Sequence, residues 1–299
     1  MISKLANNRL LKTVVTVVGQ VLMGVALYLL ATQLMRNWEQ IASDLVNMQI
    51  GFLAAALFLT LVMLLMMALG WTLALQATGV QITLRTGFII YYRTSILRYL
   101  PGSVWNFPGR AYLCQKQGIA ISAFAQSTFL ELFFLLATCG VWAGWGMANY
   151  FGSPFPLILS AVAAGAILTV IKWHRFVLSA IGRIAFMPPI KNRHTLLSIL
   201  LVYTLIWVIY GEAIVLLLQA MPGIRPPPIL LAIATNSAAW AAGFLSLSPF
   251  GLGVRELGLA VMLGPELSMA AILASLVLRC MEIGFEGLLW ITARACAIQ

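Results

Sequence analysis

Long apolar runs alternate with short polar segments along the whole chain. Six of these runs have the length of a membrane crossing: residues 14–34, 50–76, 119–148, 155–173, 196–220 and 268–291. A bilayer with a hydrocarbon core about 30 Å thick requires roughly twenty residues of apolar helix. The pattern therefore predicts an all-α, polytopic integral membrane protein with about six transmembrane helices.

Two shorter apolar pieces do not have the form of complete spans. Residues 87–100 run into the stretch LPGSVWNFPGR, and residues 229–247 run into SPFGLGVR before a short apolar return at 257–263. Proline and glycine both disfavour an uninterrupted helix. We expect both pieces to be broken helices. The expected helix-breaking residues are Pro101, Gly102, Pro108, Gly109, Pro249, Gly251 and Gly253.

The basic residues of the short loops assign the sides of the membrane. Positive charge at the N-terminus (Lys4, Arg9, Lys12), in the loop 172–193 and at Arg294 places these segments, and thus both termini, in the cytoplasm. Arg85 and Lys116 flank the first broken piece and also favour the cytoplasm, whereas the loops beside the second carry little positive charge. We therefore expect the loops beside the second broken piece to lie on the external side of the membrane.

Six crossings already account for every change of side, so each broken piece must enter and leave on the same side. The first is then a re-entrant helical hairpin from the cytoplasm, and the second one from outside. Residues 1–150 and 151–299 repeat the order span, span, hairpin, span in opposite orientations, and we expect them to form one membrane domain. Such inverted repeats are typical of secondary transporters. The alternative is an eight-span protein with two ordinary loops, which would spread Arg85, Arg98 and Arg110 over both faces.

The composition is typical of a membrane protein and indicates which classes of partner it binds. The chain is 62% apolar and 9% charged, whereas soluble domains are about half apolar and about a quarter charged. Its net charge of +10 lies largely in short loops, where it can meet anionic lipid, so we expect membrane lipids as partners and no nucleic acid. The four cysteines and two histidines have no metal-binding or catalytic spacing, so we expect no metal, no cofactor and no catalytic residues.

Charged residues at membrane depth are functional candidates, because they are unfavourable there unless paired or hydrated. Three of the arginines adjoin the Pro/Gly breaks, where free N–H groups and a guanidinium would suit a phosphate. We expect a second set of residues to balance the cavity charges or to couple transport to protons: Glu131, Glu256, Arg279, Glu282 and Glu286. The alternative is simple pairing, for example of Arg279 with Glu282 on one helix face, which leaves Glu286 for Arg255 or for a proton. The candidate substrate-binding residues are Arg98, Arg110, Arg255, Trp105, Asn106 and Asn236.

Aromatic residues near the breaks are weaker indications of a ligand site than the charged residues. Trp105 lies within the first break, and Trp240 and Phe244 precede the second. Residues 203, 207 and 210 form an aromatic stripe at helical spacing, which is more typical of packing or interface anchoring than of a ligand site.

The two breaks carry a resemblance to a known family. The stretches RYLPGSVWNFPGR and SPFGLGVRE resemble the paired signatures of the family containing the transmembrane region of lysylphosphatidylglycerol synthase, which includes stand-alone relatives labelled flippase-like. The resemblance covers essentially the whole chain. The second motif of the family usually reads Pro-Gly-Gly-Leu-Gly, so Phe250 is a departure. Because these 299 residues hold no aminoacyl-transferase domain, lysyl transfer is not expected. The resemblance implies movement of a lipid with a charged or glycosylated headgroup.

Three functions are compatible with these features. The leading hypothesis is a flippase-like translocator in the cytoplasmic membrane that moves an anionic or glycosylated lipid headgroup without covalent chemistry. The second is an integral-membrane transferase acting on lipid-linked substrates, which the single aspartate, Asp44, disfavours. The third is a non-catalytic subunit of a cell-envelope synthesis complex. Self-association and envelope-synthesis partners stay open too.

Overall fold

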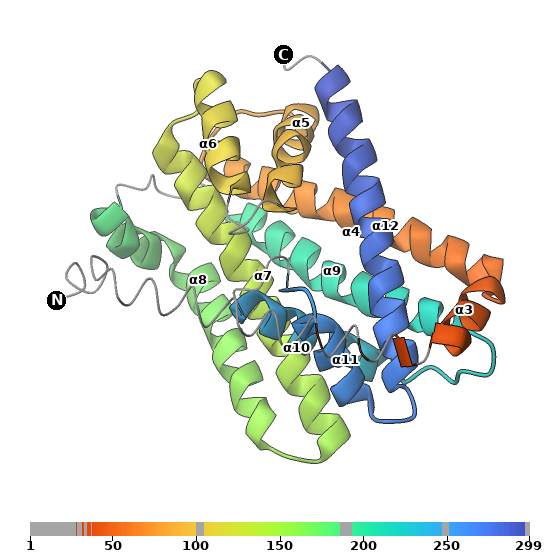
Figure 1. Ribbon diagram of the computed structural model, residues 1–299. Helices are drawn as coiled ribbons and strands as arrows, with labels where there is room; N and C mark the ends of the chain where they lie inside the picture. Colours follow the sequence, from red (N-terminus) through yellow and green to blue (C-terminus); the bar gives the residue numbers. More distant parts are fainter. Residues whose placement is uncertain are drawn as a thin grey trace, which may run out of the picture.

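The computed structural model describes residues 38–99, 105–185, 193–246 and 251–296, together with four isolated residues, Tyr28, Thr32, Met35 and Arg36. Every regular element within these ranges is helical, which confirms the all-α class (Figure 1). The elements are α3 (Trp38–Val46), α4 (Ile50–Ala77), α5 (Leu84–Ser95), the 3₁₀ helix η1 (Ile96–Tyr99), α6 (Asn106–Lys116), α7 (Ile121–Phe151), α8 (Phe155–Ala185), α9 (Arg193–Ala220), α10 (Ile229–Leu245), α11 (Val254–Leu263) and α12 (Ser268–Ala295).

Five described helices are long and apolar enough to cross a membrane: α4, α7, α8, α9 and α12. They correspond to five of the six predicted spans, and the protein is therefore a multi-pass membrane protein. The remaining predicted span, 14–34, lies outside the described residues except for a few positions.

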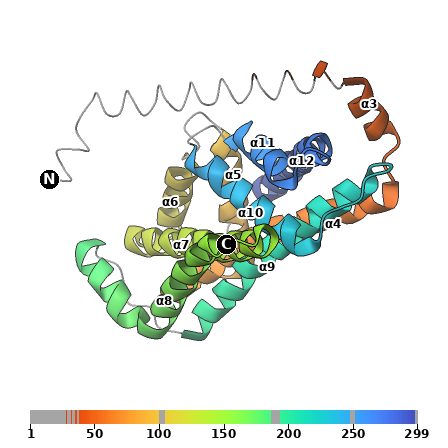
Figure 2. The same ribbon diagram turned by 90° about the horizontal axis from the view of Figure 1, so that it is seen from below.

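Helices α4 and α9 have the most extensive contact of any pair in the described bundle. Seen from below, they lie side by side, and α5, α10, α11 and α12 gather on one side of them (Figure 2). Helix α10 approaches two neighbours closely through glycines. A Cβ atom at Gly146 of α7 would lie 2.2 Å from Cβ of Ala234, and one at Gly211 of α9 would lie 2.4 Å from Cγ1 of Ile233. Small residues allow such close approach between membrane helices, where dispersion replaces the hydrophobic effect as a driving force.

Each predicted broken piece consists of two short helices. The first comprises α5, extended by η1, and α6; the second comprises α10 and α11. In Figure 1 the α5–α6 pair lies toward the upper end, where α12 ends, and the α10–α11 pair lies in the lower half, toward the loop between α7 and α8. Helix α5 starts where Thr83 accepts a hydrogen bond from the Thr86 N–H (3.1 Å), as an N-cap residue does.

The breaks differ in detail from the prediction. Pro108 and Gly109 were expected to break a helix, but both lie within the first turns of α6, so that expectation is wrong at these two positions. Proline is tolerated near a helix N-terminus because the first N–H groups have no partner within the helix. Gly251 and Gly253 do lie between α10 and α11. Pro101, Gly102 and Pro249 lie outside the described residues.

Candidate functional site

A cavity of about 470 Å³ lies where the two pairs of short helices meet α4, α7, α9 and α12. Its charged lining consists of three arginines and three glutamates, so the formal charges of these six side chains cancel. All six were among the predicted site residues. They are Arg98, Arg110, Arg255, Glu131, Glu282 and Glu286.

Arg110 of α6 is the most enclosed of the three arginines. Only 1% of its surface is exposed, and its Nη1 donates a hydrogen bond of 2.9 Å to Oε2 of Glu131 on α7. Its guanidinium carbon lies 4.1 Å from the ring centroid of Tyr91 and 4.8 Å from that of Trp71. Cation–π contacts on two rings and a buried ion pair hold this side chain in one place.

Arg255 of α11 is held less completely. Its Nη2 lies 4.0 Å from Oε1 of Glu282 on α12, and its guanidinium carbon lies 4.7 Å from the ring centroid of Tyr210. The Tyr210 hydroxyl donates a hydrogen bond to the same carboxylate. Within the described residues, Nε of Arg255 has no hydrogen-bond partner. This buried arginine therefore retains an unused hydrogen-bond donor, as does Arg110 at its Nε.

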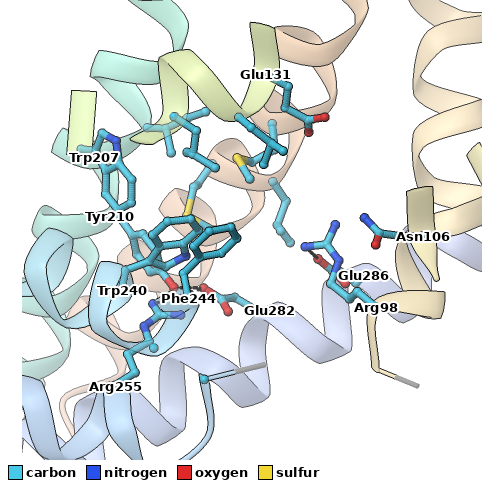
Figure 3. A pocket seen from close by; sticks show the side chains of 18 of the residues that line it. Arg98, Asn106, Glu131, Trp207, Tyr210, Trp240, Phe244, Arg255, Glu282 and Glu286 are labelled. Atoms are coloured by element: carbon cyan, nitrogen blue, oxygen red, sulfur yellow. Dashed lines mark hydrogen bonds and ion pairs between the residues drawn. The ribbon is translucent and has the colours of Figure 1, made fainter. Parts of the chain in front are cut away.

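Arg98 of η1 pairs with Glu286 of α12, with 3.1 Å between Nη1 and Oε1. Its side chain is 19% exposed, more than that of either other cavity arginine. Figure 3 shows the two side chains beside Asn106 at one end of the cavity, away from the cluster around Arg255. The pair brings together the break of the first half and the last long helix of the second.

Arg279 pairs with Glu256, at 2.5 Å between Nε and Oε1. The alternative pairings Arg279–Glu282 and Arg255–Glu286 are not the ones found: Arg255 lies nearest Glu282, and Glu286 pairs with Arg98. Neither Arg279 nor Glu256 lines the described cavity. Both instead contact the backbone between α10 and α11: Glu256 Oε2 accepts from the Gly253 N–H (2.7 Å) and Arg279 Nη2 donates to the Gly251 carbonyl (3.3 Å).

Aromatic side chains form the other end of the cavity. The ring centroids of Trp207 and Trp240 lie 5.3 Å apart in an edge-on arrangement, and those of Trp240 and Phe244 lie 5.3 Å apart in a stack. In Figure 3 these rings and Tyr210 gather near Arg255 and Glu282. The cavity thus has Arg255, Glu282 and aromatic surface at one end and the Arg98–Glu286 pair at the other, and the Arg110–Glu131 pair lines it as well.

Comparison with known families gives one match. Residues 16–280 match the family model described as the lysylphosphatidylglycerol synthase TM region. The chain belongs to this family. The match covers most of the chain and includes both breaks, so the resemblance expected from the two motifs is confirmed. A search of curated proteins finds no match to the chain.

In this family member the remaining predicted residues have different positions. Asn106 lines the cavity, with its Oδ1 unpartnered within the described residues. Trp105 is 52% exposed and Asn236 is buried in α10, and neither lines the described cavity. These locations provide no support for a direct binding role of Trp105 or Asn236.

Several residues that line the cavity are not indicated by the sequence pattern. Trp207 and Tyr210 had been assigned to a packing stripe, yet both line the cavity, whereas Tyr203 of the same stripe does not. Tyr91, Met63 and Met67 also line it. The spacing shows that Trp207 and Tyr210 share a face, but a helix that is apolar all round does not reveal which face meets the cavity.

Proposed function

We propose that this protein moves a lipid with an anionic or glycosylated headgroup across the cytoplasmic membrane without covalent chemistry. The observation that carries the proposal is the charged cavity within a bundle of membrane-spanning helices. Three arginines and three glutamates line it, and charges at such depth mark substrate or ion pathways rather than packing.

A headgroup phosphate can bind in this cavity by exchanging partners with the glutamates. The guanidinium of Arg255 is held by one contact at 4.0 Å to Glu282, and a bidentate phosphate contact is stronger than an ion pair at that distance. Glu282 would keep its hydrogen bond from Tyr210 when the arginine turns to the ligand. The glutamates balance the cavity while it is empty, because three unpaired buried cations would be strongly unfavourable.

The lipid tail needs an apolar path. Apolar side chains of α4 and α7 line the cavity beside the charged residues, among them Met63, Met67, Leu132 and Leu135. The headgroup would occupy the polar part while the acyl or prenyl tail remains in the bilayer. The rings of Trp240 and Phe244 offer a stacking surface for a headgroup that carries a sugar.

The proposed transport cycle uses the two broken helices as re-entrant hairpins that reach the cavity from opposite sides. The positions of the α5–α6 and α10–α11 pairs toward opposite ends of the bundle in Figure 1 and the loop charges support this arrangement. Alternate tilting of the two inverted repeats would expose the headgroup first to one side and then to the other. Both termini would then lie in the cytoplasm.

Reconstitution in liposomes tests the function directly. The purified protein is placed in liposomes with a trace of one tail-labelled lipid, and a membrane-impermeant reductant bleaches the label on the outer leaflet. The panel holds phosphatidylglycerol, phosphatidylethanolamine, phosphatidylcholine and a labelled polyprenyl phosphate sugar. A translocator exposes label from the inner leaflet for at least one of these lipids. Bleaching that stops at the outer leaflet for every lipid would contradict the proposal.

The two alternative functions have their own signatures in the same preparation. A transferase would change the mass of the labelled lipid when a donor is added, whereas a translocator leaves it intact. A non-catalytic envelope subunit would move no lipid on its own, and neutral replacement of the cavity charges would leave the activity of its complex unchanged.

A further inference from the structure

We infer that Arg279 and Glu256 are positioning residues that hold the turn at residues 251–253, before α11, and thereby direct Arg255 into the cavity. This inference rests on the proposed function for its consequence in transport. The claim that the ion pair holds the turn is independent of that function. Glu256 and Arg279 are 0% and 3% exposed, and neither belongs to the described cavity lining.

The turn has a backbone that needs external support. Gly251 and Gly253 have φ angles of 68° and 80°, in the left-handed region that side chains with a Cβ rarely adopt. A Cβ at Gly251 would lie 3.0 Å from Cα of Gly243 on α10, so the turn also packs tightly on the preceding helix. Buried backbone groups in such a turn require hydrogen-bond partners.

Arg279 and Glu256 supply those partners from two directions. Oε2 of Glu256 accepts the Gly253 N–H at 2.7 Å, which caps the start of α11. Nη2 of Arg279 donates to the Gly251 carbonyl at 3.3 Å, and its Nε lies 2.5 Å from the other Glu256 oxygen. One ion pair from α11 and α12 therefore binds one N–H and one C=O of the same turn.

Arg255 directly precedes Glu256 in the first turn of α11, so the position of this turn fixes the direction of its side chain. The two adjacent side chains have different contacts. Arg255 faces Tyr210 and Glu282 in the cavity, while Glu256 contacts the backbone N–H of Gly253. A glutamate at the third position of a helix that accepts from the N-cap N–H is one half of the capping-box arrangement. Loss of that bond would free the turn and, with it, the guanidinium.

The chemistry distinguishes this role from that of an ordinary ion pair. A simple pair would be restored by exchanging the charges in the double variant E256R/R279E. Arginine cannot accept a hydrogen bond, so the exchanged pair would leave the Gly253 N–H without an acceptor. Glu256→Gln keeps an acceptor oxygen and is the milder change; Glu256→Ala removes both the cap and the charge.

Amide hydrogen exchange on the full-length protein in detergent tests the structural part. We expect Glu256→Ala to speed exchange in a peptide covering residues 251–257 by about tenfold or more, since the Gly253 N–H loses its acceptor. Glu256→Gln should have a smaller effect, and E256R/R279E should exchange as fast as Glu256→Ala. Exchange in α4 and α9 should match the parent, which shows that the variants are folded. Parent-like exchange at 251–257 in Glu256→Ala would overturn the inference.

Transport by the same variants tests the consequence. A variant that misplaces Arg255 should need a higher fraction of labelled lipid for half-maximal rate, and Glu256→Ala combined with Arg255→Ala should be no slower than Arg255→Ala alone. Faster exchange with parent-like transport in Glu256→Ala would overturn the positioning role. If the parent protein moves no lipid of the panel, the proposed function fails, while the exchange rates still decide whether the pair holds the turn.

Discussion

Arg98 and Glu286 form an ion pair between the two halves of the chain, with 3.1 Å between Nη1 and Oε1. Arg98 comes from η1 at the end of the first short helix, and Glu286 comes from α12, the last long helix. Breaking a buried ion pair at one partner leaves a charge without compensation. The contact therefore couples the break of the first half to the second half.

Glu286→Gln should lower the free energy of unfolding by about 1–3 kcal/mol, less than for a fully enclosed pair, because water can reach part of the Arg98 side chain. Thermal unfolding in detergent measures this, with Glu266→Gln in an exposed turn as the matched control. If Glu286 is only a static partner of Arg98, transport by the variant should keep the pH response of the parent protein. If Glu286 carries a proton during transport, this pH response should disappear in the variant. Normal stability together with unchanged transport would contradict both roles.

Arg110→Ala should both destabilise the protein and stop transport, because Glu131 would be left buried without its 2.9 Å partner. We expect a loss of about 3–5 kcal/mol in the free energy of unfolding. The double variant R110M/E131L should recover much of this stability, since a buried ion pair can be replaced by apolar side chains of similar size. It should not recover transport. A transport-competent R110M/E131L protein would rule out a headgroup contact for Arg110.

Arg255→Ala should cost less stability than Arg110→Ala, because the Arg255–Glu282 contact is long (4.0 Å) and Glu282 keeps the hydrogen bond from Tyr210, and it should still lose transport. Arg255→Lys should restore only part of the rate, since an ammonium cannot form the planar two-bond contact with a phosphate. Transport rates at equal amounts of folded protein in the liposomes measure both effects. Equal rates for Arg255→Lys and the parent would show that charge alone suffices.

Gly251→Ala should destabilise the turn before α11. The residue has φ of 68°, and its new Cβ would lie 3.0 Å from Cα of Gly243, so left-handed strain of about 1–2 kcal/mol adds to a steric conflict. Gly284→Ala in α12 is the control, because nothing lies within 4 Å of its Cβ position. It should stabilise the helix by about 0.5–1 kcal/mol. Thermal unfolding of the two variants should therefore shift in opposite directions.

Much of the fold could be predicted, because helix length and apolar content are local properties of a membrane sequence. The predicted spans 50–76 and 268–291 agree closely with Ile50–Ala77 and Ser268–Ala295. The start of α6 is not predicted, because Pro108 and Gly109 are typical of a helix break, although the first turn of a helix tolerates proline.

The types of residue that line the site could be predicted from the sequence, but the partner of each charged side chain could not. Arg279 and Glu282 lie three residues apart on one helix, which suggested a local pair, yet Arg279 contacts Glu256 of α11. Partners of this kind depend on how distant helices meet, which spacing along one helix does not encode. The same reason explains why Tyr210 was assigned to packing although it contacts both Arg255 and Glu282.

The proposed arrangement, with two re-entrant hairpins entering from opposite sides, predicts that Gln117 and Glu266 lie on opposite sides of the membrane; they follow α6 and α11 respectively. Single cysteines at these exposed positions, in a protein without its native cysteines, should react with impermeant reagents from the cytoplasmic and the external side respectively. Labelling of both from the same side would contradict the inverted arrangement.

The most direct measurement compares three proteins in one lipid-translocation assay: the parent, Arg255→Ala and Arg85→Ala. Arg85 is an exposed residue at the start of α5 and does not line the described cavity. If the cavity arginines bind the headgroup, the parent and Arg85→Ala move the lipid at similar rates, and Arg255→Ala is slower by about tenfold or more, since a lost charge-assisted contact is worth roughly 1.5–3 kcal/mol. Equal rates for all three folded proteins would contradict the account.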